Sequence, residues 1–200
     1  MCIRDRFITP IVCQVFSAAP NDSAWSRQNL QRLYTNVERS LIRVDADELT
    51  YPLHVILRYE IEKELIEGRA EVSDIPAMWD EKMMVYLNID TRGNYKDGCL
   101  QDVHWPAQLF GYFPTYTLGA MMAAQFYNAM SKALPDLVEQ IRHGHLQSAL
   151  EWLRTNVHSK GSLLMTEELI ESATGENLNA RYFLDHLKLR YLESANELGD

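Results

Sequence analysis

Residues 98–105 combine the side-chain types that carry out proton transfer in enzymes. Gln101, Asp102 and His104 lie within four positions of one another, in a stretch that reads as a loop. The aspartate or the glutamine could fix one tautomer of the imidazole and leave its second nitrogen free. A loop whose polar groups bind only its own backbone would have the same composition. The spacing by itself leaves both interpretations open.

An aromatic stretch follows at residues 110–117. Tyr112 and Tyr116 each carry a hydroxyl that needs a hydrogen-bond partner when the ring is buried. A phenol can also donate to an oxyanion that develops during a reaction. An aromatic stripe at the start of a helix usually belongs to the core, so a structural role stays open. The sequence does not distinguish between the two tyrosines.

Two arginines stand beside carboxylates at short spacing. Arg43 precedes Asp45 and Asp47, either of which could cap the following helix and pair with the arginine. Arg58 lies four residues before Glu62, and opposite charges at this spacing face each other on a helix. Local ion pairs would therefore explain both arginines without a substrate.

The histidines form no recognisable metal-binding motif. A helical zinc site needs two histidines at i and i+4 with a neighbouring glutamate, and no HExxH occurs. His143 and His145 are two residues apart at a predicted helix end, where a cation is favourable. The cysteines include no CxxC pair, and phosphate-binding and serine-hydrolase motifs are absent too. The full set of histidines is His54, His104, His143, His145, His158 and His186.

The positions of apolar residues predict helices almost throughout the chain. The clearest helix is at residues 46–67, where apolar side chains recur at helical spacing and Gly68 fits the helix stop. No alternation typical of a strand is long enough to predict a sheet, so we expect an all-α, bundle-like fold with loops at 88–108 and 160–164. Further helices are expected at 25–40, from Ser73 or Asp74 onward, and at 113–134, 135–144, 146–159, 166–174 and 177–198.

The composition disfavours several kinds of partner. Apolar residues make up 46% of the chain, enough for a substantial core, and the formal net charge is -9. That charge disfavours nucleic acid, whose phosphates need clustered Lys and Arg, and it disfavours an anionic membrane surface. No apolar run reaches the roughly 18 residues of a membrane helix. Three widely spaced cysteines suit free thiols in a reducing compartment.

Three motifs, in their order along the chain, resemble the carboxypeptidase Taq family of metallocarboxypeptidases. They are IRxxAD at 42–47, GxxQDxHW at 98–105 and FGYFPTYTLG at 110–119. The resemblance covers most of the chain from about Trp25 to the end. It implies an all-helical enzyme with a deep groove that removes C-terminal amino acids from peptides with a divalent metal, zinc or cobalt. It also implies a cytoplasmic homodimer.

The resemblance makes seven residues candidates for a site. Arg43 could grip the terminal carboxylate of a peptide bidentately, and Arg58 is the weaker candidate because Glu62 could occupy it. His104 and one of the tyrosines could stabilise a tetrahedral intermediate. The candidates are Arg43, Arg58, Gln101 and Asp102 for substrate binding, and His104, Tyr112 and Tyr116 for catalysis.

The sequence departs from the family pattern in its metal site. The HExxH helix and the HES/GQ segment should both precede Ile42, and neither occurs in residues 1–41. We therefore expect no metal ligand in the chain and no activity from the chain by itself, and a non-catalytic helical peptide-binding module is the alternative. Residues 1–6 are interpreted as a non-native leader or truncation scar, and residues 7–200 as the C-terminal part of a single helical domain. Pro10 and Gln14 interrupt the apolar stretch at 7–16 and argue against a secretory leader.

Overall fold

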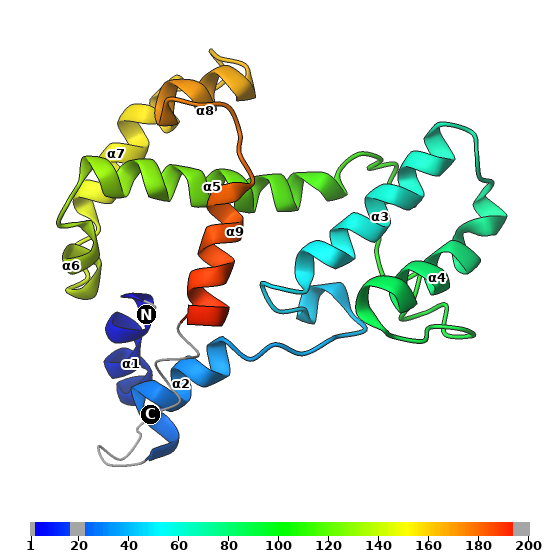
Figure 1. Cartoon of the computed structure of the whole chain (residues 1–200), viewed down its shortest axis with the longest axis horizontal. Helices are drawn as coiled ribbons and strands as arrows, with labels where there is room; N and C mark the ends of the chain where they lie inside the picture. The colour runs from blue at the N-terminus through cyan, green and yellow to red at the C-terminus, as the bar shows by residue number, and fades with distance from the viewer. Residues whose placement is uncertain (1–2, 17–22, 194–200) are drawn as a thin grey trace. The chain divides into compact units, whose positions relative to one another are not determined.

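The protein is built from helices, as the apolar spacing predicts (Figure 1). The computed structural model describes residues 3–16 and 23–193, and within these ranges no strand occurs. Within the same ranges, no helix is both long enough and apolar enough to cross a membrane. The helices are α1 Ile3–Val15, α2 Arg27–Tyr34, α3 Tyr51–Ile66, α4 Ile75–Leu87, α5 Phe113–Ala133, α6 Leu137–Arg142, α7 Gln147–Asn156, α8 Thr166–Thr174 and α9 Arg181–Lys188.

Several helices are shorter than the sequence pattern suggests. The helix expected at 46–67 begins only at Tyr51, because the Asp47 carboxylate accepts the backbone N–H groups of Leu49 and Thr50 and holds that segment in a turn. It ends near Gly68 as expected, with that glycine in the left-handed region at φ +68°. At the other end of the chain α9 stops at Lys188 and a five-residue π-helix follows, while residues 194–198 of the expected helix lie outside the described residues.

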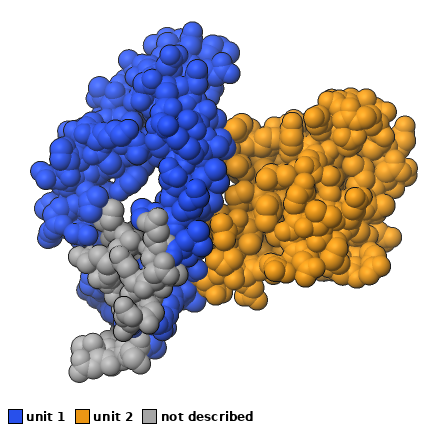
Figure 2. All heavy atoms as spheres, in the orientation of Figure 1, with its two compact units in different colours: residues 1–35, 120–200 blue, residues 36–119 orange. Residues whose placement is uncertain are grey.

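The chain divides into two compact units, which are coloured separately in Figure 2. Unit 1 consists of Met1–Thr35 and Ala120–Asp200, and unit 2 of Asn36–Gly119. Helices α3 and α4 belong to unit 2, together with the start of α5. The remaining helices and most of α5 belong to unit 1.

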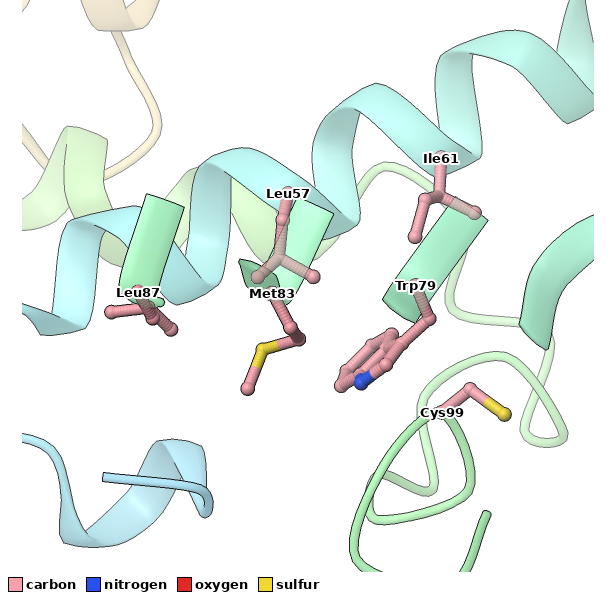
Figure 3. Packing of buried hydrophobic residues seen from close by; sticks show 6 residues of the cluster. All are labelled: Leu57, Ile61, Trp79, Met83, Leu87 and Cys99. Atoms are coloured by element: carbon pink, nitrogen blue, oxygen red, sulfur yellow. The ribbon is translucent and has the colours of Figure 1, made fainter. Parts of the chain in front are cut away.

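The core of unit 2 lies between α3 and α4. Figure 3 shows two side chains of α3 pointing toward a row from α4 that recurs every four residues. This spacing puts the row on one face of its helix. The buried cluster consists of Leu57, Ile61, Trp79, Met83, Leu87 and Cys99.

A single buried glutamine organises part of unit 1. Gln125 on α5 is 1% exposed. Its Nε2 donates to Thr174 Oγ1 at 2.9 Å and approaches two backbone oxygens of the following turn at 3.1 and 3.2 Å. Its Oε1 accepts from Asn179 N at 2.9 Å. The amide therefore holds the connection between α8 and α9, whose backbone groups have no helical partner there.

Candidate functional site

All seven predicted site residues lie in unit 2. A 3-10 turn at Arg43–Asp45 supplies the first arginine, and α3 supplies Arg58. The long connection between α4 and α5 supplies the polar residues of the second motif, and Tyr116 stands in the first turn of α5. The geometry of the unit brings most of these side chains together.

Asp102 lies between the two arginines and accepts hydrogen bonds from both. Its Oδ1 accepts from Arg43 Nε at 3.1 Å and from Arg43 Nη2 at 2.7 Å. Its Oδ2 accepts from Arg58 Nε at 2.7 Å, and Arg58 Nη2 lies 2.6 Å from the same oxygen. Arg43 is 7% exposed and Arg58 0%. The carboxylate therefore ties the 3-10 turn, α3 and the connecting loop together inside the unit.

Burial and charge have opposite effects on the pKa values of Asp102 and the two arginines. Burial by itself would raise the pKa of Asp102, but the hydrogen bonds and positive charges of the two arginines outweigh it and hold the pKa below its ordinary value. Burial lowers the pKa of Arg58 to about 10, because Asp102 offsets the desolvation only in part. For Arg43 the aspartate prevails over burial, and the pKa is raised. All three side chains are therefore charged at neutral pH.

The interactions of Arg58 and Gln101 differ from those expected from the sequence. Arg58 pairs with Asp102, not with Glu62 four residues along its helix. Gln101 does not reach the imidazole: its Oε1 accepts from the backbone N–H of Arg43 at 2.9 Å, and its Nε2 donates to the carbonyls of Leu41 and Asp97 at 3.2 and 2.7 Å. Gln101 therefore fixes the backbone on which Arg43 stands.

His104 is bonded to a tyrosine of α5. Its Nε2 lies 3.0 Å from the hydroxyl of Tyr116. Its Nδ1 is buried and has no hydrogen-bond partner among the described residues, since the nearest oxygen of Asp102 is 3.8 Å away. That distance is too long for a hydrogen bond between the aspartate and the ring. The hydrogen bond that orients the imidazole of His104 therefore comes from Tyr116 and not from Asp102 or Gln101.

Aromatic rings separate the histidine from the arginines. Phe113 is 1% exposed, with its centroid 4.4 Å from that of His104. The same ring faces the guanidinium carbons of Arg43 and Arg58 at 5.7 and 5.4 Å. Tyr112 is 43% exposed and packs its ring against His104 at 5.5 Å. The cluster therefore has a buried, charged end and an end where one tyrosine meets solvent.

Three polar residues outside the seven candidates also contact this cluster or its loop. The Tyr51 hydroxyl accepts from Arg43 Nη1 at 2.8 Å. Glu62 is 3% exposed and binds the loop that carries His104. His54 is 0% exposed, and burial, followed by the charge of Arg58, lowers its pKa to about 4. All three stand on α3, and His54 and Glu62 are buried there among Val55, Leu57 and Ile61. A polar residue among buried apolar neighbours is the signal that could have revealed these two.

The described residues do not fit a bound metal ion. No three His, Cys, Asp or Glu side chains among them come together as ligands. His143 and His145 stack at 6.1 Å near the end of α6, where His143 Nδ1 lies 3.0 Å from the carbonyl oxygen of Glu139. This contact agrees with the helix-end interpretation of the pair. The arginine–aspartate cluster can bind an anion or orient a polar group, but nothing in it resembles a metal site.

Comparison with known proteins identifies relatives that are much longer than this chain. Residues 4–191 match the family described as carboxypeptidase Taq (M32) metallopeptidase. Carboxypeptidase 1 of Bacillus subtilis is 40% identical over 187 residues, which are 93% of this chain and 37% of that protein. Thermostable carboxypeptidase 1 of Thermus thermophilus is 45% identical over 155 residues, which are 78% of this chain and 30% of that protein.

The solved structures agree with these relatives. Metallocarboxypeptidase 1 of Trypanosoma cruzi superimposes with a TM-score of 0.90 at 44% identity, covering 94% of this chain and 39% of that protein. The chain thus spans between 30% and 39% of the length of these relatives. Because the match extends over nearly all of its residues, the chain belongs to the carboxypeptidase Taq (M32) family of metallopeptidases.

Proposed function

We propose that this chain forms part of a metal-dependent carboxypeptidase that releases C-terminal amino acids from peptides. The observation that carries the proposal is the family match over residues 4–191, with relatives named as carboxypeptidases. The finer properties implied by the resemblance belong to the same proposal: zinc or cobalt as the metal, a homodimer as the assembly and the cytoplasm as the location. No step is assigned to the metal on this chain, because its described residues do not fit one.

Arg43 is the residue we assign to the terminal carboxylate of the peptide. A guanidinium has five N–H groups, and the bonds to Asp102 and Tyr51 use three of them. One N–H remains on each terminal nitrogen, and the side chain keeps 8% of its surface exposed. Arg58 is 0% exposed, so we assign it to holding Asp102 and not to contact with the peptide.

His104 and the two tyrosines are the residues we assign to the developing oxyanion. We assign Tyr116 to orienting the imidazole, since its hydroxyl lies 3.0 Å from Nε2 of His104. We assign Tyr112 to direct contact with the oxyanion, because it is 43% exposed and its hydroxyl bonds to no described residue. A donor that strengthens its bond as negative charge develops lowers the barrier to reaction.

A chimeric enzyme tests the proposal. Residues 4–191 replace the matched part of Bacillus subtilis carboxypeptidase 1, and the release of C-terminal amino acids is measured together with metal content. We expect activity, and we expect His104→Ala to lower the turnover number on the order of a hundredfold. His158→Ala, at an exposed histidine of unit 1, serves as the control and should leave turnover unchanged.

Two outcomes would contradict the proposal. A chimera that folds and binds metal but releases no amino acid would show that this chain lacks the carboxypeptidase groups, and would favour the non-catalytic peptide-binding module. Equal turnover in the His104→Ala and His158→Ala chimeras would remove the catalytic assignment of His104 and leave it a structural residue.

A further inference from the structure

Glu62 on α3 is a buried carboxylate with an unusual pair of donors. It is 3% exposed. Its Oε1 accepts from the indole Nε1 of Trp105 at 2.7 Å, and its Oε2 accepts from the backbone N–H of Gly111 at 3.2 Å. Among the residues that the structure describes, it has no ion-pair partner. Burying a carboxylate costs free energy that hydrogen bonds must offset, and here two neutral donors provide them. We therefore attribute the burial of Glu62 to these two bonds.

The two donors bracket the loop between the candidate catalytic side chains. Trp105 directly follows His104 in the chain, and Gly111 directly precedes Tyr112. Gly111 has φ +76°, a left-handed conformation that turns the chain into the start of α5. One side chain of α3 therefore fixes both ends of residues 105–111.

We propose that Glu62 is a positioning residue that sets the placement of His104 and Tyr112 relative to each other. The inference rests on the proposed function, since that function gives the two side chains their role. Rings that meet at 5.5 Å can act on one substrate atom only if their backbones keep a fixed separation, and a misplacement of about 1 Å can cost about a hundredfold in rate. Glu62 itself touches neither ring through any hydrogen bond.

The first experiment uses the full 200-residue chain and does not depend on activity. Glu62→Gln keeps one acceptor and turns an NH₂ group toward the other donor, whereas Glu60→Gln, on the same helix with Lys82 and Tyr86 as partners, is the matched control. NMR spectra report the Trp105 indole N–H, the Gly111 amide and the His104 imidazole, which are assigned from Trp105→Phe, Gly111→Ala and His104→Gln variants. We expect all three signals to move in Glu62→Gln, and the Gly111 amide to exchange with solvent about tenfold to a hundredfold faster. Glu60→Gln should leave them in place.

The second experiment places the same variants in the chimeric enzyme. Glu62→Gln should lower kcat by about tenfold to a hundredfold while KM and metal content stay within about twofold. An unchanged His104 signal in the isolated chain, or equal kcat for Glu62→Gln and Glu60→Gln, would overturn the positioning role. A chimera that is inactive before any substitution would instead count against the proposed function, and the NMR result would decide the role of Glu62 independently.

Discussion

Replacing Asp102 by Asn should destabilise unit 2 more than any other single change to the arginine cluster. The substitution keeps the size of the side chain but removes the charge that accepts from both guanidinium groups. With the carboxylate present, the three charges sum to +1, because two arginines face one aspartate. Without it the sum becomes +2 on side chains that are 8% and 0% exposed. Two like charges would then lie in the core without a counter-ion.

The magnitude follows from what the change leaves behind. Breaking a buried ion pair by removing one partner costs about 3–5 kcal/mol, because the other charge stays desolvated. We expect the lower end, about 3 kcal/mol, because the asparagine oxygen keeps one acceptor and Asp102 retains 11% of its side-chain exposure. Arg58→Met should cost less, since Arg43 then keeps its aspartate and the sum of charges falls to zero. That order, with Asp102→Asn the worse, is the distinctive part of the prediction.

Acid titration provides a second signature. The pKa of Asp102 is lowered in the folded chain, although burial opposes the shift, because the two arginines stabilise the charged form. A carboxyl group with a lowered folded pKa contributes stability above its unfolded pKa, about 3.9, and that stability is lost as the pH falls through the folded value. The unmodified chain should therefore lose stability below about pH 4 through this group, and Asp102→Asn should lack that part of the slope.

Urea unfolding followed by tryptophan fluorescence measures both effects. Trp79 and Trp105 lie in unit 2, so Trp25→Phe and Trp152→Phe in the background restrict the signal to that unit. Asp90→Asn is the control, because the Asp90–Arg92 pair is exposed and its loss should give no resolvable change in midpoint. An Asp102→Asn free energy of unfolding within about 1 kcal/mol of the parent, or a larger loss in Arg58→Met, would refute the charge argument.

Three further predictions concern Gln125, His54 and the isolated chain. Gln125→Ala should cost about 1–3 kcal/mol in unit 1, because four hydrogen bonds to the α8–α9 connection lose their partner; faster hydrogen exchange at the Asn179 amide checks it, and unchanged exchange would contradict it. His54→Leu should flatten the pH dependence of stability between about pH 6.5 and 4. In that window the unfolded histidine takes up a proton, whereas the buried one, with a pKa of about 4, does not, so the unmodified chain loses stability as the pH falls. Denaturation midpoints at a series of pH values measure the slope, and an equal slope in both chains would argue against this. The 200-residue chain by itself should neither bind zinc tightly nor cleave peptides, since it has no HExxH motif and its described residues form no ligand group; one tightly bound zinc per chain in equilibrium dialysis would refute this.

The sequence predicted the helices better than it predicted the partners of their polar side chains. Apolar spacing located α3, α4 and α5 because periodic burial is a local property of the chain. The i,i+4 rule paired Arg58 with Glu62, and the structure gives each of them a partner from the loop. An exposed pair at that spacing is worth only about 0.2–0.5 kcal/mol, which is far less than the cost of leaving either charge buried without a partner. Long-range contacts therefore decided the pairing, and one sequence without coordinates does not contain them.

The sequence was enough to single out His104 but not to predict the orientation of its ring. The residue types in residues 98–105 pointed to chemistry, and their order suggested that Asp102 or Gln101 would bond to the imidazole. Asp102 is too far away at 3.8 Å, and Gln101 bonds to backbone groups instead. The contact with Tyr116 joins residues twelve apart, across the turn that begins α5.

Helix α3 attaches to the loop on both sides of this histidine, by bonds of opposite polarity. Arg58 binds Asp102, two residues before His104, and one turn further along the helix Glu62 binds Trp105, the residue after it. Arg58 and Glu62, one turn apart on the buried face of α3, thus match a loop that offers a carboxylate and an indole N–H in the same order. A loop shifted by one residue would separate Arg58 from Asp102 and Glu62 from Trp105, so the two bonds favour the observed register of the loop as well as its attachment. The loop is thus attached on both sides of the histidine, whose ring also contacts Tyr116 directly.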